Sequence, residues 1–159
     1  MAQKIVDTTT NNGSYIGDPA KTAFGKVNDN FTELYSNGYR RDNIVGAVGR
    51  SGSTVTGAII ERGSNSSGNY TRYADGTQEC WSTPSFTASA NRANGYSLGF
   101  AAAFADTPSV TVKMSAGNSG GRVEGIEALN STYVSGFITN NTSSDMTGVL
   151  MMRAVGRWY

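Results

Sequence analysis

The chain contains no histidine and a single cysteine, Cys80. Without histidine, the Ser-His and Cys-His pairs that activate nucleophiles cannot form, and the commonest protein ligand of metal ions is missing. One cysteine excludes an intrachain disulfide and a zinc site built from several cysteines. We therefore expect a protein that is not an enzyme and needs no metal or cofactor. Cys80 lies beside Trp81, and we expect it to be a small buried residue and not a reactive thiol.

Charge and long apolar runs are also scarce. The formal net charge of +1 gives no electrostatic basis for binding nucleic acid or an anionic membrane. No apolar run approaches the roughly 20 residues that span a bilayer, so no membrane insertion is expected. The first residues lack the basic-then-apolar pattern of a signal peptide, which predicts synthesis in the cytoplasm.

Large apolar residues are few as well. Leu, Ile, Val and Phe together make up 28 of the 159 residues. So low a content is typical of disorder when the net charge is large, which is not the case here. We therefore expect further apolar surface to be buried between identical chains. The 20 glycines and the many Ser, Thr and Asn residues suit short strands joined by tight turns.

Residues 18–37 form the one segment with a clear helical pattern. Asp18 is a suitable N-cap, Pro19 suits the first helical position, and Gly38 offers a left-handed stop. Apolar side chains recur at the a and d spacing of a coiled coil over barely two heptads. Because an isolated helix of this length is marginal in water, the stripe needs a partner, either sister helices about a threefold axis or the β domain. We predict trimerisation through four residues: Phe24, Val27, Phe31 and Leu34.

Two stretches around this helix are rich in glycine or polar residues. Residues 1–17 form a polar lead-in, which is either a docking segment for a neighbouring protein or a frayed terminus. Residues 39–62 carry four glycines among small and β-branched residues. They predict an extended connector, either wound against two copies of itself or acting as a flexible linker.

From residue 63 onward the pattern is that of an all-β domain. The strongest signal is YTRYADGTQECW, residues 70–81, which predicts a β-hairpin around Asp75-Gly76 with a type I′ turn. Further strands are predicted at 81–87, 96–104, 109–114, 122–129, 132–139 and 147–158. Together they predict an antiparallel β-sandwich-like domain.

Two of these strands are apolar on both faces. A strand of this kind is buried on both faces, either at the centre of a sandwich or at a subunit interface. In residues 132–139, one face carries Tyr133 and Phe137 and the other Val134 and Ile138; in residues 147–158, one face carries Leu150, Met152 and Ala154 and the other Val149, Met151, Arg153, Val155 and Arg157.

Several stretches resemble a known family. Residues 57–81, GAIIERGSNSSGNYTRYADGTQECW, resemble the segment that opens the C-terminal β-rich domain of many bacteriophage tail fibres and related tail proteins. Later similar stretches are FAAAFADTPSV at 100–110 and AVGRW at 154–158, so the resemblance covers about residues 57–159. The helical run AFGKVNDNFTELY also resembles segments near the N-termini of phage tail proteins. The resemblance implies a virion tail component with a trimeric, receptor-facing tip.

The expected protein is thus a mainly β homotrimer whose short N-terminal helix could form a trimeric coiled coil. We predict a lead-in and helix at 1–38 for virion attachment or trimerisation, the connector at 39–62 and the β domain at 63–159. One expected function is adhesion to a bacterial surface glycan or protein. Another is a structural or adaptor role, with the N-terminal region contacting other tail proteins. A remote alternative is a surface-glycan hydrolase with a carboxylate pair drawn from Asp75, Glu79, Asp106 and Asp145.

Receptor contacts are expected in loops, because the strands are committed to burial. Amide and guanidinium donors beside an aromatic ring suit hydroxyl-rich sugars, which take hydrogen bonds at their edges and stack on flat faces. Two loops offer such groups. The first, with the tyrosine that follows it, offers Asn91, Arg92, Asn94 and Tyr96, and the second offers Asn118 and Arg122. The plain alternative is that these are ordinary solvated turns.

Overall fold

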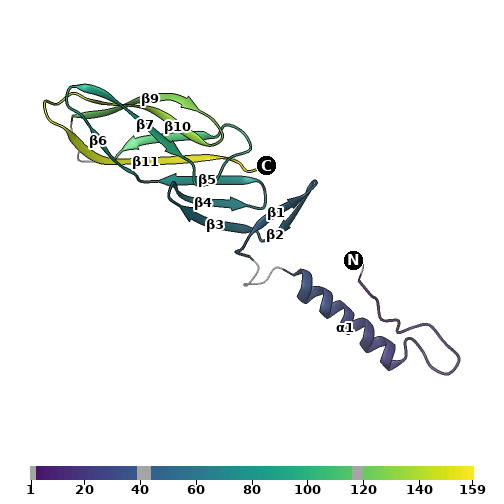
Figure 1. Ribbon diagram of the computed structural model, residues 1–159. Helices are drawn as coiled ribbons and strands as arrows, with labels where there is room; N and C mark the ends of the chain where they lie inside the picture. The colour runs from purple at the N-terminus through teal and green to yellow at the C-terminus, as the bar shows by residue number, and fades with distance from the viewer. Residues whose placement is uncertain (1–2, 39–43, 116–119) are drawn as a thin grey trace. The chain divides into compact units, whose positions relative to one another are not determined.

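The computed structural model describes residues 3–38, 44–115 and 120–159. The chain divides into two compact units, Met1–Arg41 and Asp42–Tyr159. The second unit is mainly β with antiparallel sheets, as the sequence pattern predicts (Figure 1). Among the described residues, no helix combines the length and the apolar character that crossing a bilayer requires.

The first unit contains the helix α1, Ala20–Asn37. Its N-cap is Pro19 and not Asp18 as predicted, and no side chain caps this end. The Asp18 carboxylate instead accepts hydrogen bonds from the Asp7 amide at 2.8 Å and from Lys26 Nζ at 2.6 Å. The predicted left-handed stop is also wrong, because Gly38 has an extended φ of −71° and its amide bonds to the Leu34 carbonyl.

The lead-in folds back along one side of the helix. The Lys4 amide donates to Asn30 Oδ1 at 2.9 Å, and Asn30 Nδ2 donates to the Lys4 carbonyl at 2.7 Å. Lys4 Nζ forms an ion pair with Asp29 at 2.7 Å. Hydrogen bonds from the Thr10 hydroxyl and the Thr9 and Thr10 amides lower the pKa of Asp7 to about 2. The lead-in is therefore attached to the helix by directed polar contacts.

Eleven strands make up the second unit within its described residues. A separate hairpin pairs β1, Val48–Ser51, with β2, Thr54–Gly57. The larger sheet contains β3 (Ile60–Asn65), β4 (Gly68–Tyr73), β5 (Thr77–Ser82), β6 (Ser85–Ala88), β8 (Ser109–Met114) and β11 (Met146–Arg157). The smaller sheet has the order β7 (Arg92–Gly99), β10 (Tyr133–Asn140) and β9 (Gly121–Leu129).

Strand β11 organises the larger sheet. Its first four residues pair with β6 and its C-terminal half pairs with β5, while β8 pairs with its opposite edge. Because side chains alternate along a strand, Leu150, Met152 and Ala154 all point to one face, where they are 0–3% exposed. This row forms the floor of the core.

The core lies between the two sheets. Val134 and Ile138 of β10 are 0% and 2% exposed and pack with residues of β11 in two clusters. The predicted division of faces is confirmed on both strands, because Phe137 and Met151, each one residue removed from an inward position, are both 40% exposed. The apolar side chains of the outer faces are therefore left open in a single chain.

Two local predictions differ from the structure. The predicted connector contains the β1–β2 hairpin, and β3 begins at Ile60, so strand structure starts before residue 63. The turn before β5 has three residues, 74–76, of which only Gly76 has a positive φ, +93°. It is a three-residue loop with a left-handed glycine and not the predicted two-residue type I′ turn. The proposed three-part domain division itself remains a prediction.

Candidate functional site

The predicted receptor loops lie together at one end of the β domain. The Asn91 amide donates to the Thr142 carbonyl at 3.0 Å, which joins the β6–β7 loop to the β10–β11 loop. The buried Asn140 donates from Nδ2 to the Ala88 carbonyl at 2.9 Å and so links the ends of β10 and β6, from which these two loops start. The Asn141 amide donates to the Gly120 carbonyl at 3.1 Å, which adds the end of the β8–β9 loop. Asn118 lies outside the described residues.

Two of the predicted contact residues serve the fold instead. Tyr96 is 9% exposed, and its hydroxyl donates to the Gly125 carbonyl at 3.2 Å. Its ring packs with Ile138 and Leu150 and offers no face to a ligand. The Asn94 side chain accepts from the Ser89 amide and donates to the Ser89 carbonyl, closing the turn that carries it. The loop predicted at 88–95 is shorter in the structure, because β7 begins at Arg92 and both residues belong to this strand, where they support the fold.

Arg92 and Arg122 are exposed, as a binding role requires, but they do not converge. Arg92 is opposite Asn140, and Arg122 is opposite Thr139, on the two edges of β10. Successive residues of a strand point to opposite faces of the sheet, so the two guanidinium groups belong to different faces. Asn91 is exposed and has a left-handed φ of 51°. Receptor contact through these three residues remains a prediction.

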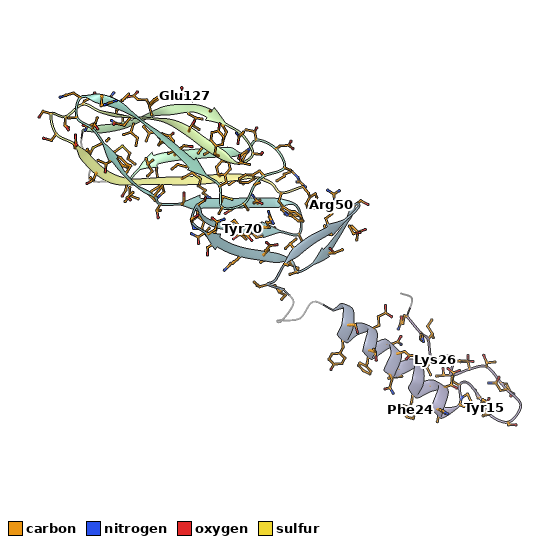
Figure 2. All side chains as sticks on the ribbon, in the orientation of Figure 1. Tyr15, Phe24, Lys26, Arg50, Tyr70 and Glu127 are labelled. Atoms are coloured by element: carbon orange, nitrogen blue, oxygen red, sulfur yellow. The ribbon has the colours of Figure 1, made fainter. Side chains whose placement is uncertain are left out.

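The residues that carry the family resemblance form a polar network. Tyr70 lies on the β3–β4 pair (Figure 2), and its hydroxyl donates to Glu61 Oε1 at 2.8 Å. Glu61 Oε2 accepts from the Val48 amide at 3.0 Å, and Arg72 Nη1 lies 3.6 Å from Oε1. The hydrogen bond to Glu61 and burial both raise the pKa of Tyr70. Gly63 lies opposite Tyr70, where a side chain would collide with the phenol ring.

Gln78 extends this network to residues 100–104. It is fully buried, and its Nε2 donates to the carbonyls of Ala102 and Ala103 at 2.9 and 3.1 Å. Its Oε1 accepts from Arg72 Nε at 2.8 Å. Asn65 likewise donates from Nδ2 to the Ala101 carbonyl at 2.8 Å. These amides satisfy a loop that would otherwise bury unpaired carbonyl groups.

The C-terminal stretch completes the same network. Trp158 Nε1 donates to the Tyr73 carbonyl at 2.8 Å, and Arg72 Cζ lies 5.8 Å from the centroid of the Trp158 ring. The Tyr159 hydroxyl donates to the Ala74 carbonyl at 3.2 Å. Residues 57–81, 100–110 and 154–158, the stretches that resemble phage tail fibres, are therefore in contact. Their contacts support the fold.

The predicted trimerisation residues are exposed on the helix. Phe24, which stands out from the helix in Figure 2, is 69% exposed, and Phe31 and Leu34 are 55% and 64% exposed. Val27 is less exposed, at 36%. The lead-in contacts the helix through Asp29 and Asn30 and leaves this stripe uncovered.

A groove that sequence reasoning missed lies on the outer face of β5, β11 and β8. It has a volume of about 590 Å³. The register fixes its floor, because Arg153 of β11 lies between Trp81 of β5 and Thr111 of β8. Trp81 is 40% exposed. The alternation of β11 hinted at this face, but no local pattern reveals which three strands lie side by side.

Polar groups lie among the apolar side chains of this groove. Arg153 Nη2 donates to both carboxylate oxygens of Glu79 at 3.1 Å. Lys113 lies opposite Met151, and Ser109 lies opposite Val155. The groove thus combines an indole ring, two cationic side chains and several hydroxyl groups. That combination suits a polar ligand with a flat apolar face.

Among solved structures, the chain is similar to pyocin tail fibres. No protein-family model and no curated protein matches the chain. An N-truncated R1-type pyocin tail fibre is 15% identical, with a TM-score of 0.49 over 61% of this chain and 84% of that chain. A C-terminal fragment of the P. aeruginosa R1 pyocin fibre has the same identity and TM-score over 61% of this chain and 28% of its own. A P. aeruginosa R2 pyocin fibre fragment is 16% identical, with a TM-score of 0.44 over 97% of this chain and 34% of its own.

The chain therefore spans about a third or less of the two longer fibre fragments. Tail fibres are also the class of protein that the sequence resemblance indicates. With TM-scores below 0.5, however, this likeness bears on neither the activity nor the partners of the chain.

Proposed function

We propose that the chain is a phage tail-fibre or tail-tip protein that attaches a virion to a bacterial surface through a trimeric β tip. The observation that carries this proposal is the open groove beside Trp81, on a domain whose framework residues resemble those of tail fibres. An exposed indole beside free hydrogen-bond donors is a feature of binding sites, and the fold itself makes no use of it.

The helix supports assembly into a trimer. Its a and d side chains are 36–69% exposed in the single chain, while polar contacts hold the lead-in on another side. A narrow stripe of this kind is stabilised by burial against copies of the same helix. The stripe is short, so we expect the β domains to contribute to the same assembly.

The outer face of β7, β10 and β9 supports such a contribution. Phe137 is 40% exposed and lies opposite a glycine on each neighbouring strand, Gly95 and Gly125. Tyr133 is 36% exposed and lies opposite Gly99. Aromatic rings such as these are enriched in the core of protein–protein interfaces. A second copy of the chain is the expected occupant.

We also propose that the chain acts by binding and not by catalysis. Two of the candidate carboxylates, Asp75 and Asp145, lie at opposite ends of β11. Asp75 is next to the last residue of this strand, because Arg157 Nη2 donates to its carbonyl, and Asp145 directly precedes the first residue, Met146. A strand of 12 residues spans roughly 35–40 Å, whereas glycosidase carboxylates lie about 5–9.5 Å apart. Within one chain these two carboxylates are therefore too far apart to act together.

The N-terminal unit favours a further role in attachment to other tail proteins. Ile5 and Ile16 of the lead-in are 75% and 68% exposed, and Tyr15 is 48% exposed. None of them belongs to the a and d stripe. We propose that this unit contacts a neighbouring virion protein, which is the structural role that the sequence also allows.

Adsorption of the purified chain to bacteria tests the proposed function. Light scattering during size exclusion should first give three times 16.8 kDa. The fluorescently labelled trimer should then bind cells of a susceptible strain saturably and should block infection by the parent phage. An assembled trimer that binds isolated tail particles but no strain in a panel of potential hosts would identify a structural adaptor instead.

A further inference from the structure

We infer that the groove on the outer face of β5, β11 and β8 binds a saccharide that carries an anionic group, a carboxylate or a phosphate. This inference rests on the proposed function and names the ligand of its site. Three features carry it: the free donors of Arg153, the free ammonium of Lys113 and the exposed ring of Trp81.

Arg153 occupies the centre of the groove and retains donors for a ligand. Only its Nη2 is used by Glu79, which accepts at 3.1 Å through both oxygens. Within the described residues, no hydrogen bond engages Nε or Nη1 of Arg153. The side chain is 66% exposed. Guanidinium nitrogens left free in this way match the two oxygens of a carboxylate or phosphate.

Lys113 adds a second positive charge to the same face. It lies opposite Met151. This pair is two residues along the strands from the Thr111–Arg153 pair, and so it is the next pair on the same face. Its ammonium group has no hydrogen bond or ion pair with any described residue. The charged groups that line the groove are therefore Glu79, Arg153 and Lys113, and one positive charge is left unbalanced.

Trp81 supplies the apolar contact that a sugar ring requires. It lies directly opposite Arg153 and on the same face, so the indole is next to the guanidinium group. Stacking on an aromatic face and hydrogen bonding at the ring edge are the two contacts by which proteins hold sugars. Hydroxyl groups for the edge come from Ser109, Thr111 and Thr83.

The charges make a saccharide a better occupant than a second copy of the chain. The centre of a protein–protein interface is depleted of charged residues, yet Arg153 lies in the centre of this face. Burying it under an apolar surface would remove hydration from a charged pair without supplying new polar partners, which is unfavourable. On the outer face of β10, Phe137 lies directly between two glycines, Gly95 and Gly125, and not between charged residues, which makes that face the better surface for assembly.

Binding of the trimer to defined polysaccharides tests the inference. The carboxylate probes are alginate, polygalacturonate and polysialate, and the phosphate probe is phosphomannan. The neutral counterparts are methyl-esterified polygalacturonate and mannan. We expect at least one anionic probe to bind at least tenfold more tightly than its neutral counterpart, with affinity falling as salt rises. The probe that binds distinguishes a carboxylate from a phosphate.

Single substitutions assign the binding to the groove. Arg153→Gln and Lys113→Gln should each lower the affinity for the anionic probe severalfold to tenfold, and Trp81→Ala should abolish binding. Arg62→Gln is the matched control, because it removes one positive charge from the outer face of β3, three strands from β11 in the same sheet. It should leave the affinity unchanged.

Three outcomes would overturn the inference. The first is a trimer that adsorbs to cells but binds none of the four anionic probes, which leaves the proposed function standing. The second is equal binding of anionic and neutral probes. The third is a monomer in light scattering after Arg153→Gln or Trp81→Ala, which would make this face a contact between chains. A trimer that binds neither cells nor probes would refute the proposed function as well.

Discussion

The Tyr70 hydroxyl donates a 2.8 Å hydrogen bond to Glu61 Oε1 across the β3–β4 pair. Tyr70→Phe removes this donor and leaves a mostly buried carboxylate one partner short. We expect unfolding in urea to show a loss of about 1–3 kcal/mol. Tyr73→Phe is the control, because the Tyr73 hydroxyl has no hydrogen bond with any described residue. Equal stability of the two variants would show that the Tyr70–Glu61 bond contributes nothing.

The same pair predicts a response to alkaline pH. The hydrogen bond to Glu61, followed by burial, raises the pKa of Tyr70 in the folded chain above its usual value of 10.0. Stability from this group is therefore fully present below about pH 10 and is lost as pH rises through the higher pKa of the folded state. The stability difference between the wild type and Tyr70→Phe should shrink as pH rises from about 10 through the higher pKa of the folded state. A difference that stays constant across this range would contradict the prediction.

Phe31→Asp should weaken assembly of the N-terminal helix. Phe31 is 55% exposed, and in a trimer three carboxylates would meet near one axis. Light scattering and the helical signal at 222 nm should both report the loss, while the β domain stays folded. Asn28→Asp introduces the same charge outside the a and d stripe and should leave assembly intact. Unchanged assembly in Phe31→Asp would show that the stripe is not an oligomer contact.

Cys80 should be unreactive in the folded protein. It is fully buried, and burial raises the pKa of its thiol, so little thiolate is present near neutral pH. Labelling with a thiol-specific disulfide reagent should be slow in buffer and complete within minutes in concentrated denaturant. Rapid labelling under native conditions would mean that the core around β5 opens readily.

The predicted loops and the groove can be separated by adsorption to cells. Because Arg92 and Arg122 lie on different faces, we expect the double variant Arg92→Ala, Arg122→Ala to retain most adsorption, whereas Trp81→Ala should lose it. Tyr96→Ala is unsuitable here, because removing a buried ring costs about 3–5 kcal/mol. Loss of adsorption in the double variant alone would return the receptor site to the loops.

Alternation of side chains made the faces of the long strands predictable from sequence. The inward row of Leu150, Met152 and Ala154 and the outward Met151 and Val155 follow from a period of two residues. The helix was predictable for a similar reason, since its apolar side chains recur with a helical period. Periodic patterns depend only on local geometry, which the order of residues determines directly.

Other features depend on contacts between distant residues and were therefore missed. Tyr96 is polar enough for a surface and large enough for a core, and only its position opposite Gly136 placed it inside. Asp18 was expected to cap the helix but binds Lys26 and the Asp7 amide. The groove is made from three strands that are not consecutive in the chain, so the order of residues alone did not place Lys113 and Trp81 on the same face of β11's two neighbours.

The pairing of β11 has a consequence for synthesis on the ribosome. β11 is made after β5, β6 and β8, yet it is the strand that joins all three. Until residues 146–157 have left the exit tunnel, the earlier strands expose unpaired edges that can associate with other chains. Chains interrupted before this point should therefore be open to proteases. The larger sheet is thus closed only once this late strand has been made.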